Sequence, residues 1–284
     1  MLKQTTDHTA PGPPAPSENR GAAVTVEDAV RTFTRAGETV HALGPVSLDV
    51  RPGEFVALLG PSGCGKSTLL NLVGGLLPPT SGSIRVGEEE VDGVPERVGM
   101  MFQQAVLLAW RTVQQNVLLP VEVSEGRRGA RKAADRAAEL LELVGLTGFA
   151  DKMPNELSGG MQQRAAICRM LIQEPDVLLL DEPFGALDEF TREHMNVELA
   201  RICSITGRTA LFVTHSISEA VFLADRVVVM SARPGRIAGT LDIDLPKPRD
   251  PEIMTSATFQ DHVRDARDLL RTGYEAAATA DKEA

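Results

Sequence analysis

Short apolar runs alternate with segments of helical spacing through most of this chain. Four of the runs are apolar almost throughout and have the length of strands, at residues 55–59, 177–180, 209–213 and 226–230. Strands that are apolar on both faces belong to sheets covered on both sides, and such sheets are mostly parallel. Because helical stretches lie between the runs, the pattern predicts an α/β fold built on a mostly parallel sheet.

Two further parts are expected around that sheet. Shorter β-type runs at 23–26, 46–50 and 83–86 are placed in an antiparallel β subdomain. Residues 127–144 are rich in Arg, Ala, Glu and Leu, with apolar side chains three and four positions apart, which predicts one amphipathic helix. We interpret this helix as part of a helical subdomain, residues 104–172, inserted into the α/β core.

Both ends of the chain have the composition of tails. Residues 1–22 carry closely spaced prolines and almost no apolar bulk, so we expect this segment to be disordered. Residues 256–274 are predicted to form one helix, and residues 275–284 a second disordered tail. One large domain is therefore expected over 23–250, followed by a C-terminal helix and tail over 251–284.

Composition narrows the class of protein. Lys and Arg number 29 against 39 for Asp and Glu, and the resulting net charge of −10 argues against a broad nucleic-acid-binding face. Cys64, Cys168 and Cys203 have no metal-ligand spacing, which fits a reducing compartment and a packing role. No apolar stretch approaches the ~20 residues that span a bilayer, and no secretory signal precedes the domain, so a soluble protein is expected.

A glycine-rich loop joins the first apolar strand to a helical run. It reads Gly60-Pro61-Ser62-Gly63-Cys64-Gly65-Lys66-Ser67-Thr68 and is called the phosphate loop below. Its glycines allow backbone N–H groups to curl around phosphate oxygens, Lys66 can reach the β- and γ-phosphates, and the Ser67 hydroxyl can bind Mg²⁺. The alternative is a glycine-rich turn with a chance lysine. Because strand, loop and helix occur in the required order, the sequence predicts a nucleoside triphosphate site.

An acidic pair and a histidine follow two of the buried strands. Asp181 and Glu182 come directly after the run at 177–180, and His215 follows the run at 209–213. Ligands of parallel sheets bind at the carboxyl ends of the strands, where these side chains emerge. One carboxylate can hold a hydrated metal while the other polarises an attacking water. The alternatives are an acidic turn and a structural histidine.

The segment Leu157-Ser158-Gly159-Gly160-Met161-Gln162-Gln163-Arg164, called the signature below, narrows the class further. With the phosphate loop and the acidic pair in the same order, the chain resembles the ATP-binding-cassette (ABC) ATPases over residues 23–250. The resemblance implies a P-loop NTPase core, with ATP and Mg²⁺ as cofactors. It further implies that Asp181 binds Mg²⁺ and that Glu182 is the catalytic base.

The resemblance assigns three further positions. Gln103, after a strand signal at 98–101, resembles the glutamine that reaches Mg²⁺ and the attacking water. His215 resembles the histidine that contacts the γ-phosphate. Asp188 closes the stretch Gly-Ala-Leu-Asp, which resembles the loop through which two such domains touch.

Adenine needs a flat partner, and aromatic residues make up only 4% of the chain. Phe33, which we expect to precede the first core strands, is the candidate for stacking, with a core phenylalanine as the alternative. It resembles the aromatic residue of this family that contacts adenine.

The signature predicts a second chain. Ser158 and the N–H groups of Gly159 and Gly160, ahead of a predicted helix at 161–172, form an anion site without a ligand in their own subunit. In the family, this surface closes on ATP that the partner's phosphate loop holds. Since the chain carries one copy of each motif, the second cassette is expected to be another copy of the same chain.

Two observations favour transport. Only 53 residues separate Gln103 from Leu157, too few for the long coiled coil of DNA-repair ABC proteins. The segments 103–113, 230–237 and 244–250 resemble importer cassettes for nitrate, taurine, aliphatic sulfonates and related small anions. The chain departs from that pattern at Ser216 and Ala109, where Asp and Pro are usual.

The resemblance to importers predicts partners and a location. Trp110 with its apolar neighbours fits a groove for a helix of a membrane subunit, or else it packs the helical subdomain. We expect two permease subunits as direct partners, a solute-binding protein as an indirect one and no nucleic acid, at the cytoplasmic face of the inner membrane of a bacterium. The alternatives are a soluble ABC switch acting on nucleic acid or ribosomes, and an adaptor that does not hydrolyse ATP.

Overall fold

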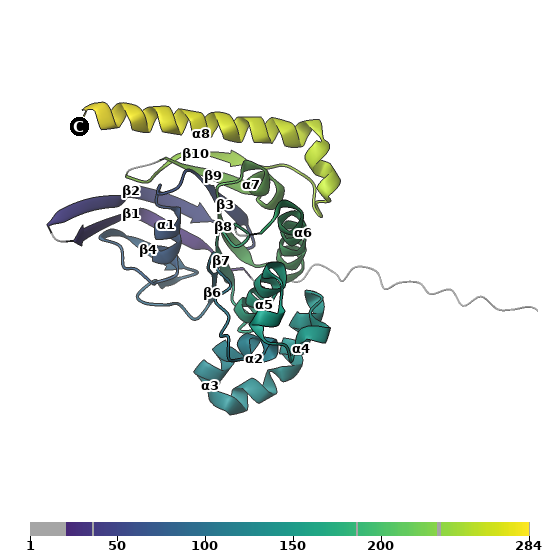
Figure 1. Cartoon of the computed structure of the whole chain (residues 1–284). Helices are drawn as coiled ribbons and strands as arrows, with labels where there is room; N and C mark the ends of the chain where they lie inside the picture. The colour runs from purple at the N-terminus through teal and green to yellow at the C-terminus, as the bar shows by residue number, and fades with distance from the viewer. Residues whose placement is uncertain (1–20, 36, 186, 232–233, 284) are drawn as a thin grey trace, which may run out of the picture.

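A computed structural model describes residues 21–35, 37–185, 187–231 and 234–283, and Figure 1 shows their arrangement. The N-terminal segment for which disorder is predicted lies outside these ranges except for residues 21 and 22. Ala186 of the predicted dimer-contact loop and residues 232–233 of the importer-like segment also lie outside them.

The larger sheet has six strands in the order β10-β9-β3-β8-β7-β6. Its strands are β3 (Phe55–Leu59), β6 (Val98–Met101), β7 (Val177–Asp181), β8 (Thr209–Thr214), β9 (Arg226–Ser231) and β10 (Arg236–Asp242). All neighbouring pairs are parallel except β9 with β10. β3, which leads into the phosphate loop, therefore lies between β9 and β8 in the middle of the sheet.

Apolar residues of β3 face two separate cores. Phe55, Ala57 and Leu59 belong to one buried cluster, whereas Val56 and Leu58 belong to the other. This alternation is what a strand of a sheet covered on both faces requires. The continuous apolar pattern of the sequence is thereby explained, and the α/β prediction is confirmed.

The smaller sheet is antiparallel, in the order β2-β1-β4-β5. Its strands are β1 (Val24–Arg35), β2 (Glu38–Val50), β4 (Ser81–Val86) and β5 (Glu89–Glu90). β1 and β2 extend well beyond the predicted runs. Residues 38–41 of β2 are exposed, and the alternation of buried residues begins only at Leu43, so the apolar pattern did not indicate the start of this strand. The polar half of this β1–β2 hairpin thus gave no hydrophobic signal.

The segment after β6 is helical, as predicted, but its elements differ from the prediction. It contains α2 (Val113–Val117), α3 (Leu119–Lys132), α4 (Ala134–Leu143) and α5 (Gly159–Leu171), with short 3-10 turns at Thr147–Phe149 and Pro154–Glu156. The single helix predicted over 127–144 is wrong, because the chain breaks at Ala133 and α3 itself is interrupted at Gly126, where φ is +72°. Apolar spacing continues across the break, so periodicity alone did not show it.

The remaining helices are α1 (Lys66–Val73), α6 (Glu189–Thr206), α7 (Ile217–Leu223) and α8 (Ala257–Glu283), with a 3-10 turn at Pro251–Thr255. α8 lies along β9 and β10 and against α7 (Figure 1), where Phe259, Val263 and Ala266 are buried. It continues to Glu283, so the prediction of disorder for 275–284 is wrong for the backbone as far as that residue. The Ala-rich end has high helix propensity and extends a helix already anchored by packing.

Within the described residues, no helix has both the length and the apolar character needed to cross a bilayer.

Candidate functional site

The phosphate loop lies between the carboxyl end of β3 and the first turn of α1. Gly65 precedes the helix with φ +92°, a left-handed conformation that favours glycine. Lys66 is buried, and its Nζ donates to the carbonyl oxygens of Gly60 at 2.7 Å and Pro61 at 2.9 Å. The ammonium group therefore lies inside the curve of the loop, where a phosphate group entering the loop would meet it.

Ser67 and Asp181 are brought together by the sheet. β3 pairs with β8 and β8 with β7, so residues far apart in the sequence end at the same edge. The Ser67 hydroxyl donates to Asp181 Oδ1 at 2.9 Å. Burial raises the pKa of the Asp181 carboxyl and the charge of Glu182 adds to that rise, while the Ser67 hydrogen bond and the charge of Lys66 oppose it.

This pair fits a magnesium ion. A hydroxyl and a carboxylate side by side are oxygen ligands of the kind that Mg²⁺ prefers. Among the residues that the structure describes, no group of three His, Cys, Asp or Glu side chains could hold a metal ion. Ser67 and Asp181 therefore fit an ion that is bound by one or two protein oxygens. Phosphates and waters would supply its other ligands, as is usual for Mg²⁺ at nucleotides.

Glu182 and His215 meet beside that pair. The Oε2 of Glu182 lies 3.2 Å from Nδ1 of His215, which follows β8. Glu182 has φ +43°, a left-handed conformation that costs a non-glycine residue on the order of 1 kcal/mol or more. Its backbone N–H donates to the carbonyl of Val213 at 3.0 Å, which holds this turn against β8.

Gln103 reaches the same place from the end of β6. A methyl group built on Gly185 would lie 3.5 Å from Gln103 Nε2 and 3.6 Å from Glu182 Oε2, so both side chains end near one point. The side chain of Gln163 donates to the backbone carbonyl of Gln103 at 3.1 Å. Gln163 is part of the signature, but no spacing rule in the sequence indicates this contact, which positions Gln103.

The signature begins α5. Ser158 is the N-cap of that helix and accepts from the N–H of Met161 at 3.3 Å. A methyl group on Gly160 would lie only 2.7 Å from Thr191 Cγ2, so the close approach of α5 to α6 requires glycine there. Thr191 in turn donates its N–H and its hydroxyl to Asp188, the N-cap of α6, and these bonds lower the pKa of the Asp188 carboxyl.

The signature and the phosphate loop have different neighbours in one chain. Signature residues Gly159 and Gly160 face Leu187 and Thr191, at the start of α6. The phosphate loop instead lies against the end of β9 and the middle of β2, through Gly60 and Gly65 respectively. Ser158 is exposed, and its hydroxyl accepts the capping bond from Met161.

Phe33 lies within β1 and not before the first strand, which corrects the expected position. It pairs with Val40 of β2, is 36% exposed and has the Arg31 guanidinium 4.7 Å from its ring centre. The alternative of a core phenylalanine does not fit this exposure. The same hairpin touches the phosphate loop farther along, since a methyl group on Gly65 would lie 2.9 Å from the Ala42 carbonyl oxygen.

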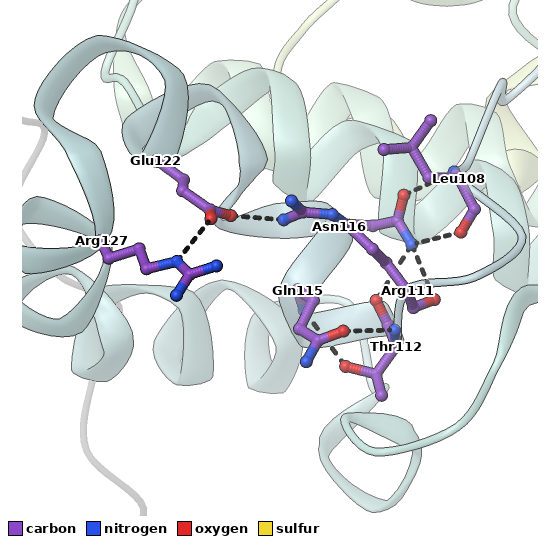
Figure 2. A network of polar contacts seen from close by, with 7 residues as sticks. All are labelled: Leu108, Arg111, Thr112, Gln115, Asn116, Glu122 and Arg127. Carbon is purple, nitrogen blue, oxygen red and sulfur yellow. Dashed lines mark hydrogen bonds and ion pairs between the residues drawn. The ribbon is translucent and has the colours of Figure 1, made fainter.

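Trp110 lies in the connection between β6 and α2 and is 74% exposed. The alternative that it packs the helical subdomain is therefore wrong. Figure 2 shows the adjoining turn held by Asn116, whose side chain bonds to the backbone of Leu108, Arg111 and Thr112. Arg111 also pairs with Glu122 of α3 and holds the pKa of that carboxyl below its ordinary value.

A phosphate loop on a central parallel strand, with an acidic pair and a histidine at the ends of neighbouring strands, defines the class of P-loop nucleotide-binding proteins. The family model described as "ABC transporter" matches residues 43–185. The chain belongs to the ABC transporter family, as its motifs predicted.

Several relatives support this assignment. A taurine import ATP-binding protein of Rhizobium johnstonii is 50% identical over 210 residues, which cover 74% of this chain and 79% of the relative. A nitrate import ATP-binding protein of Synechococcus elongatus is 48% identical over 78% of this chain and 34% of its own length. An ABC transporter ATP-binding protein of Methanocaldococcus jannaschii is 44% identical over 87% of this chain and 90% of the relative.

Solved structures confirm the fold. A dimeric ATP-binding cassette in a post-hydrolysis state, bound to ADP and Pi, aligns with a TM-score of 0.67 at 32% identity, covering 78% of this chain and all of that one. A second dimeric structure, of a bacterial ABC transporter cassette, aligns with a TM-score of 0.68 at the same identity.

Proposed function

We propose that this chain is the ATP-hydrolysing subunit of a bacterial ABC importer for a small anion such as nitrate, taurine, a sulfonate or a related organic acid. ATP hydrolysis is supported by one observation above all. The side chains of Glu182, His215 and Gln103 lie close together, beside the Ser67–Asp181 pair of the phosphate-loop site. The solute class is supported by the relatives named for taurine and nitrate import.

The reaction is attack of water on the γ-phosphorus of ATP, with cleavage of its bond to the oxygen that bridges the β- and γ-phosphates. Glu182 accepts a proton from the attacking water. Lys66 and the N–H groups of the phosphate loop bind the β- and γ-phosphates, as the buried position of the ammonium group allows. Gln103 orients the water, and His215, within hydrogen-bonding distance of Glu182, contacts the γ-phosphate.

Ser67 and Asp181 would hold Mg²⁺, which when bound would neutralise negative charge on the phosphate oxygens. The protein contributes the position of these two ligands. The Ser67 hydroxyl and the Asp181 carboxylate are already aligned by their 2.9 Å hydrogen bond. We also assign Ser62 and Thr68 to the phosphate-facing surface and Pro61 and Gly63 to its turn, in which Gly63 has φ +77°.

The complete site belongs to two chains. Ser158 and Gly159 are exposed at the start of α5, and methyl groups built on Gly159 and Gly160 would meet Leu187 and Thr191. We assign these three signature residues to the γ-phosphate of ATP held by a second copy, with Asp188 at the contact between copies. The dimeric cassettes of the same fold support this arrangement.

The importer's other partners are two permease subunits and, through them, a solute-binding protein. The exposed indole of Trp110 beside the rigid turn at Asn116 supports a docking surface for a permease helix. The protein would then act as a peripheral subunit at the cytoplasmic face of the inner membrane. The alternative, a soluble switch acting on nucleic acid or ribosomes, has no support from the relatives and conflicts with a net charge of −10.

ATP hydrolysis by matched variants tests the enzymatic proposal. Glu182→Gln should keep nucleotide binding and lower the hydrolysis rate by about a hundredfold or more, because it removes the base alone. Lys66→Ala should weaken nucleotide binding itself. Binding of a fluorescent nucleotide and release of phosphate are measured for both. A wild-type rate in Glu182→Gln would contradict the base assignment, and absence of hydrolysis in the native protein would leave the adaptor alternative.

A further inference from the structure

The turn before β10 lies against the phosphate loop, a feature that the proposed reaction does not use. Gly235, immediately before β10, is buried. A methyl group built on it would lie 2.2 Å from the carbonyl oxygen of Cys64 and 3.1 Å from its carbonyl carbon. Real Cβ contacts are not this short, so the Cys64 carbonyl occupies the space that any side chain at position 235 would need.

The same residue is bonded to the β1–β2 hairpin. Its N–H donates to the carbonyl of Ala42 at 3.2 Å, and its carbonyl accepts the N–H of Gly44 at 2.9 Å. Together these bonds form an isolated parallel bridge between Gly235 and Leu43 of β2. Gly235 therefore links β2 of the small antiparallel sheet to the start of β10, the edge strand of the large sheet.

Three backbone segments thus meet at one point. The Ala42 carbonyl oxygen that accepts from Gly235 would also lie 2.9 Å from a methyl group on Gly65, in the phosphate loop. On the other side of the loop, a methyl group on Gly60 would lie 2.6 Å from the Met230 carbonyl oxygen at the end of β9. The phosphate loop is therefore in close contact with β9 at Gly60 and with β2 at Gly65.

The hairpin side of this junction carries the candidate for adenine stacking. Phe33 pairs with Val40, two residues from Ala42 on β2. A nucleotide bound by Phe33 and by the phosphate loop would therefore span the junction. Its affinity depends on the spacing of the two subsites, because a ligand held at both ends loses binding when its two sites are displaced relative to each other.

We propose that Gly235 is a positioning residue that fixes the phosphate loop to the β1–β2 hairpin and so sets the spacing between the phosphate and adenine subsites. This inference rests on the proposed nucleotide-binding function. It assigns a role to the Pro234-Gly235-Arg236 segment, which the sequence alone marked only as a subfamily pattern. The role is exerted through backbone contacts, and Gly235 touches no reacting atom.

Gly235→Ala tests the proposal. Its new methyl group must displace the Cys64 carbonyl, the hairpin or both. We expect the Kd for ATP to rise about tenfold or more, while the Kd for inorganic tripolyphosphate, which occupies one subsite only, rises less than about threefold. Competition against a fluorescent ADP analogue measures both constants, and thermal unfolding is followed in parallel.

Gly239→Ala is the matched control. It places the same methyl group on β10, but its nearest neighbours are side-chain atoms of Leu269 in α8, the closest at 3.0 Å. We expect this variant to keep the native ratio of the two affinities whatever its stability. Gly44→Ala disturbs the junction from the hairpin side, against Arg236 and Pro234 at 3.1–3.4 Å, and serves if Gly235→Ala does not fold.

The outcomes separate the two hypotheses. Equal ATP affinity in Gly235→Ala and the native protein, or equal losses for ATP and tripolyphosphate, would overturn the positioning role while leaving the proposed function intact. Failure of the native protein to bind ATP would instead overturn the proposed function. Selective loss of ATP affinity in Gly235→Ala or Gly44→Ala, absent in Gly239→Ala, supports the inference.

Discussion

At the scale of single residues, the site contains a carboxylate that is unfavourable to the nucleotide-free fold. Asp181 is partly buried beside Glu182, and burial is the main cause of its raised pKa. The compensating bond from Ser67 and the charge of Lys66 do not cancel that effect. A carboxylate with a pKa raised in this way is a candidate for binding a ligand, and we propose that the ligand is Mg²⁺.

Asp181→Asn should therefore stabilise the nucleotide-free protein at neutral pH. Asparagine keeps an oxygen acceptor for Ser67 and removes the buried charge. Because the pKa is raised above the ordinary value of 3.8 in the folded state, the destabilising effect of the aspartate is absent below 3.8 and grows as pH rises through the folded pKa. The melting temperature should exceed that of the native protein at pH 7, and the difference should shrink as the pH falls toward 3.8.

Asp188→Asn is the control of opposite sign. The pKa of Asp188 is lowered by its bonds from Thr191, so its carboxylate stabilises the fold above 3.8 and that stabilisation is lost as the pH falls. Its melting temperature should drop at pH 7. A lower melting temperature in Asp181→Asn as well would contradict the account of Asp181.

The sequence predicted that the phosphate loop, the acidic pair and His215 lie at one edge of the sheet, because each of them follows an apolar strand. Glu182 and His215 are adjacent in space for that reason, as are Ser67 and Asp181. The left-handed conformation of Glu182 was not readable, because no glycine marks it. That conformation depends on long-range hydrogen bonding to β8.

At the scale of elements, the helical subdomain depends on buried polar contacts that periodicity does not reveal. Asn116 of α2 is fully buried, and Figure 2 shows it at the centre of the turn that precedes the helix. Its Oδ1 accepts the N–H of Leu108 at 2.7 Å, and its Nδ2 donates to the carbonyls of Leu108, Arg111 and Thr112 at 3.0–3.1 Å. The sequence offers only a polar residue within a short helix.

Asn116→Ala should destabilise the protein by about 2 kcal/mol or more, because it leaves buried backbone groups without partners. Gln114→Ala, on the same helix, removes a partly exposed side chain and should cost less than about 0.5 kcal/mol. Urea unfolding of both variants measures the difference. Equal stability of the two variants would show that the turn does not depend on Asn116.

Element boundaries were predicted less well than element types. The polar ends of β1 and β2 escaped detection because they lie outside the apolar alternation. The break between α3 and α4 escaped because the apolar spacing continues across it, although Gly126 and Gly129 are poor helix formers. α8 continued past its predicted end because the segment after its buried residues still favours helix.

At the scale of the whole molecule, the arrangement of the two sheets and the helical subdomain determines which motifs lie next to each other. Motif order predicted that the phosphate loop and Asp181 meet, since both end strands of one parallel sheet. The junction at Gly235 required knowledge of how β2 of the small sheet lies beside the turn before β10. Neither segment has a sequence pattern that indicates its contact with the other, so only the structure could show it.

The signature makes a prediction about the assembly. Ser158 is exposed and caps α5. Ser158→Arg adds bulk and charge where a second copy would close, so it should abolish hydrolysis while leaving nucleotide binding to the single chain. Ser158→Ala is the comparison variant, because it removes the cap, at a cost of about 1 kcal/mol, and the hydroxyl assigned to the γ-phosphate, but adds no bulk or charge, so its loss of hydrolysis should be smaller than that of Ser158→Arg.

Mixing two inactive variants tests whether the site is shared. Lys66→Ala lacks a working phosphate loop but keeps its signature, and Ser158→Arg has the reverse defect. A mixed dimer contains one composite site with both parts intact, built from Lys66 of one copy and Ser158 of the other. If a single intact site supports turnover, phosphate release should appear on mixing and rise with the fraction of mixed dimers. Mixed dimers that form but release no phosphate would contradict a signature acting across the interface, since each defect would then reside within its own chain.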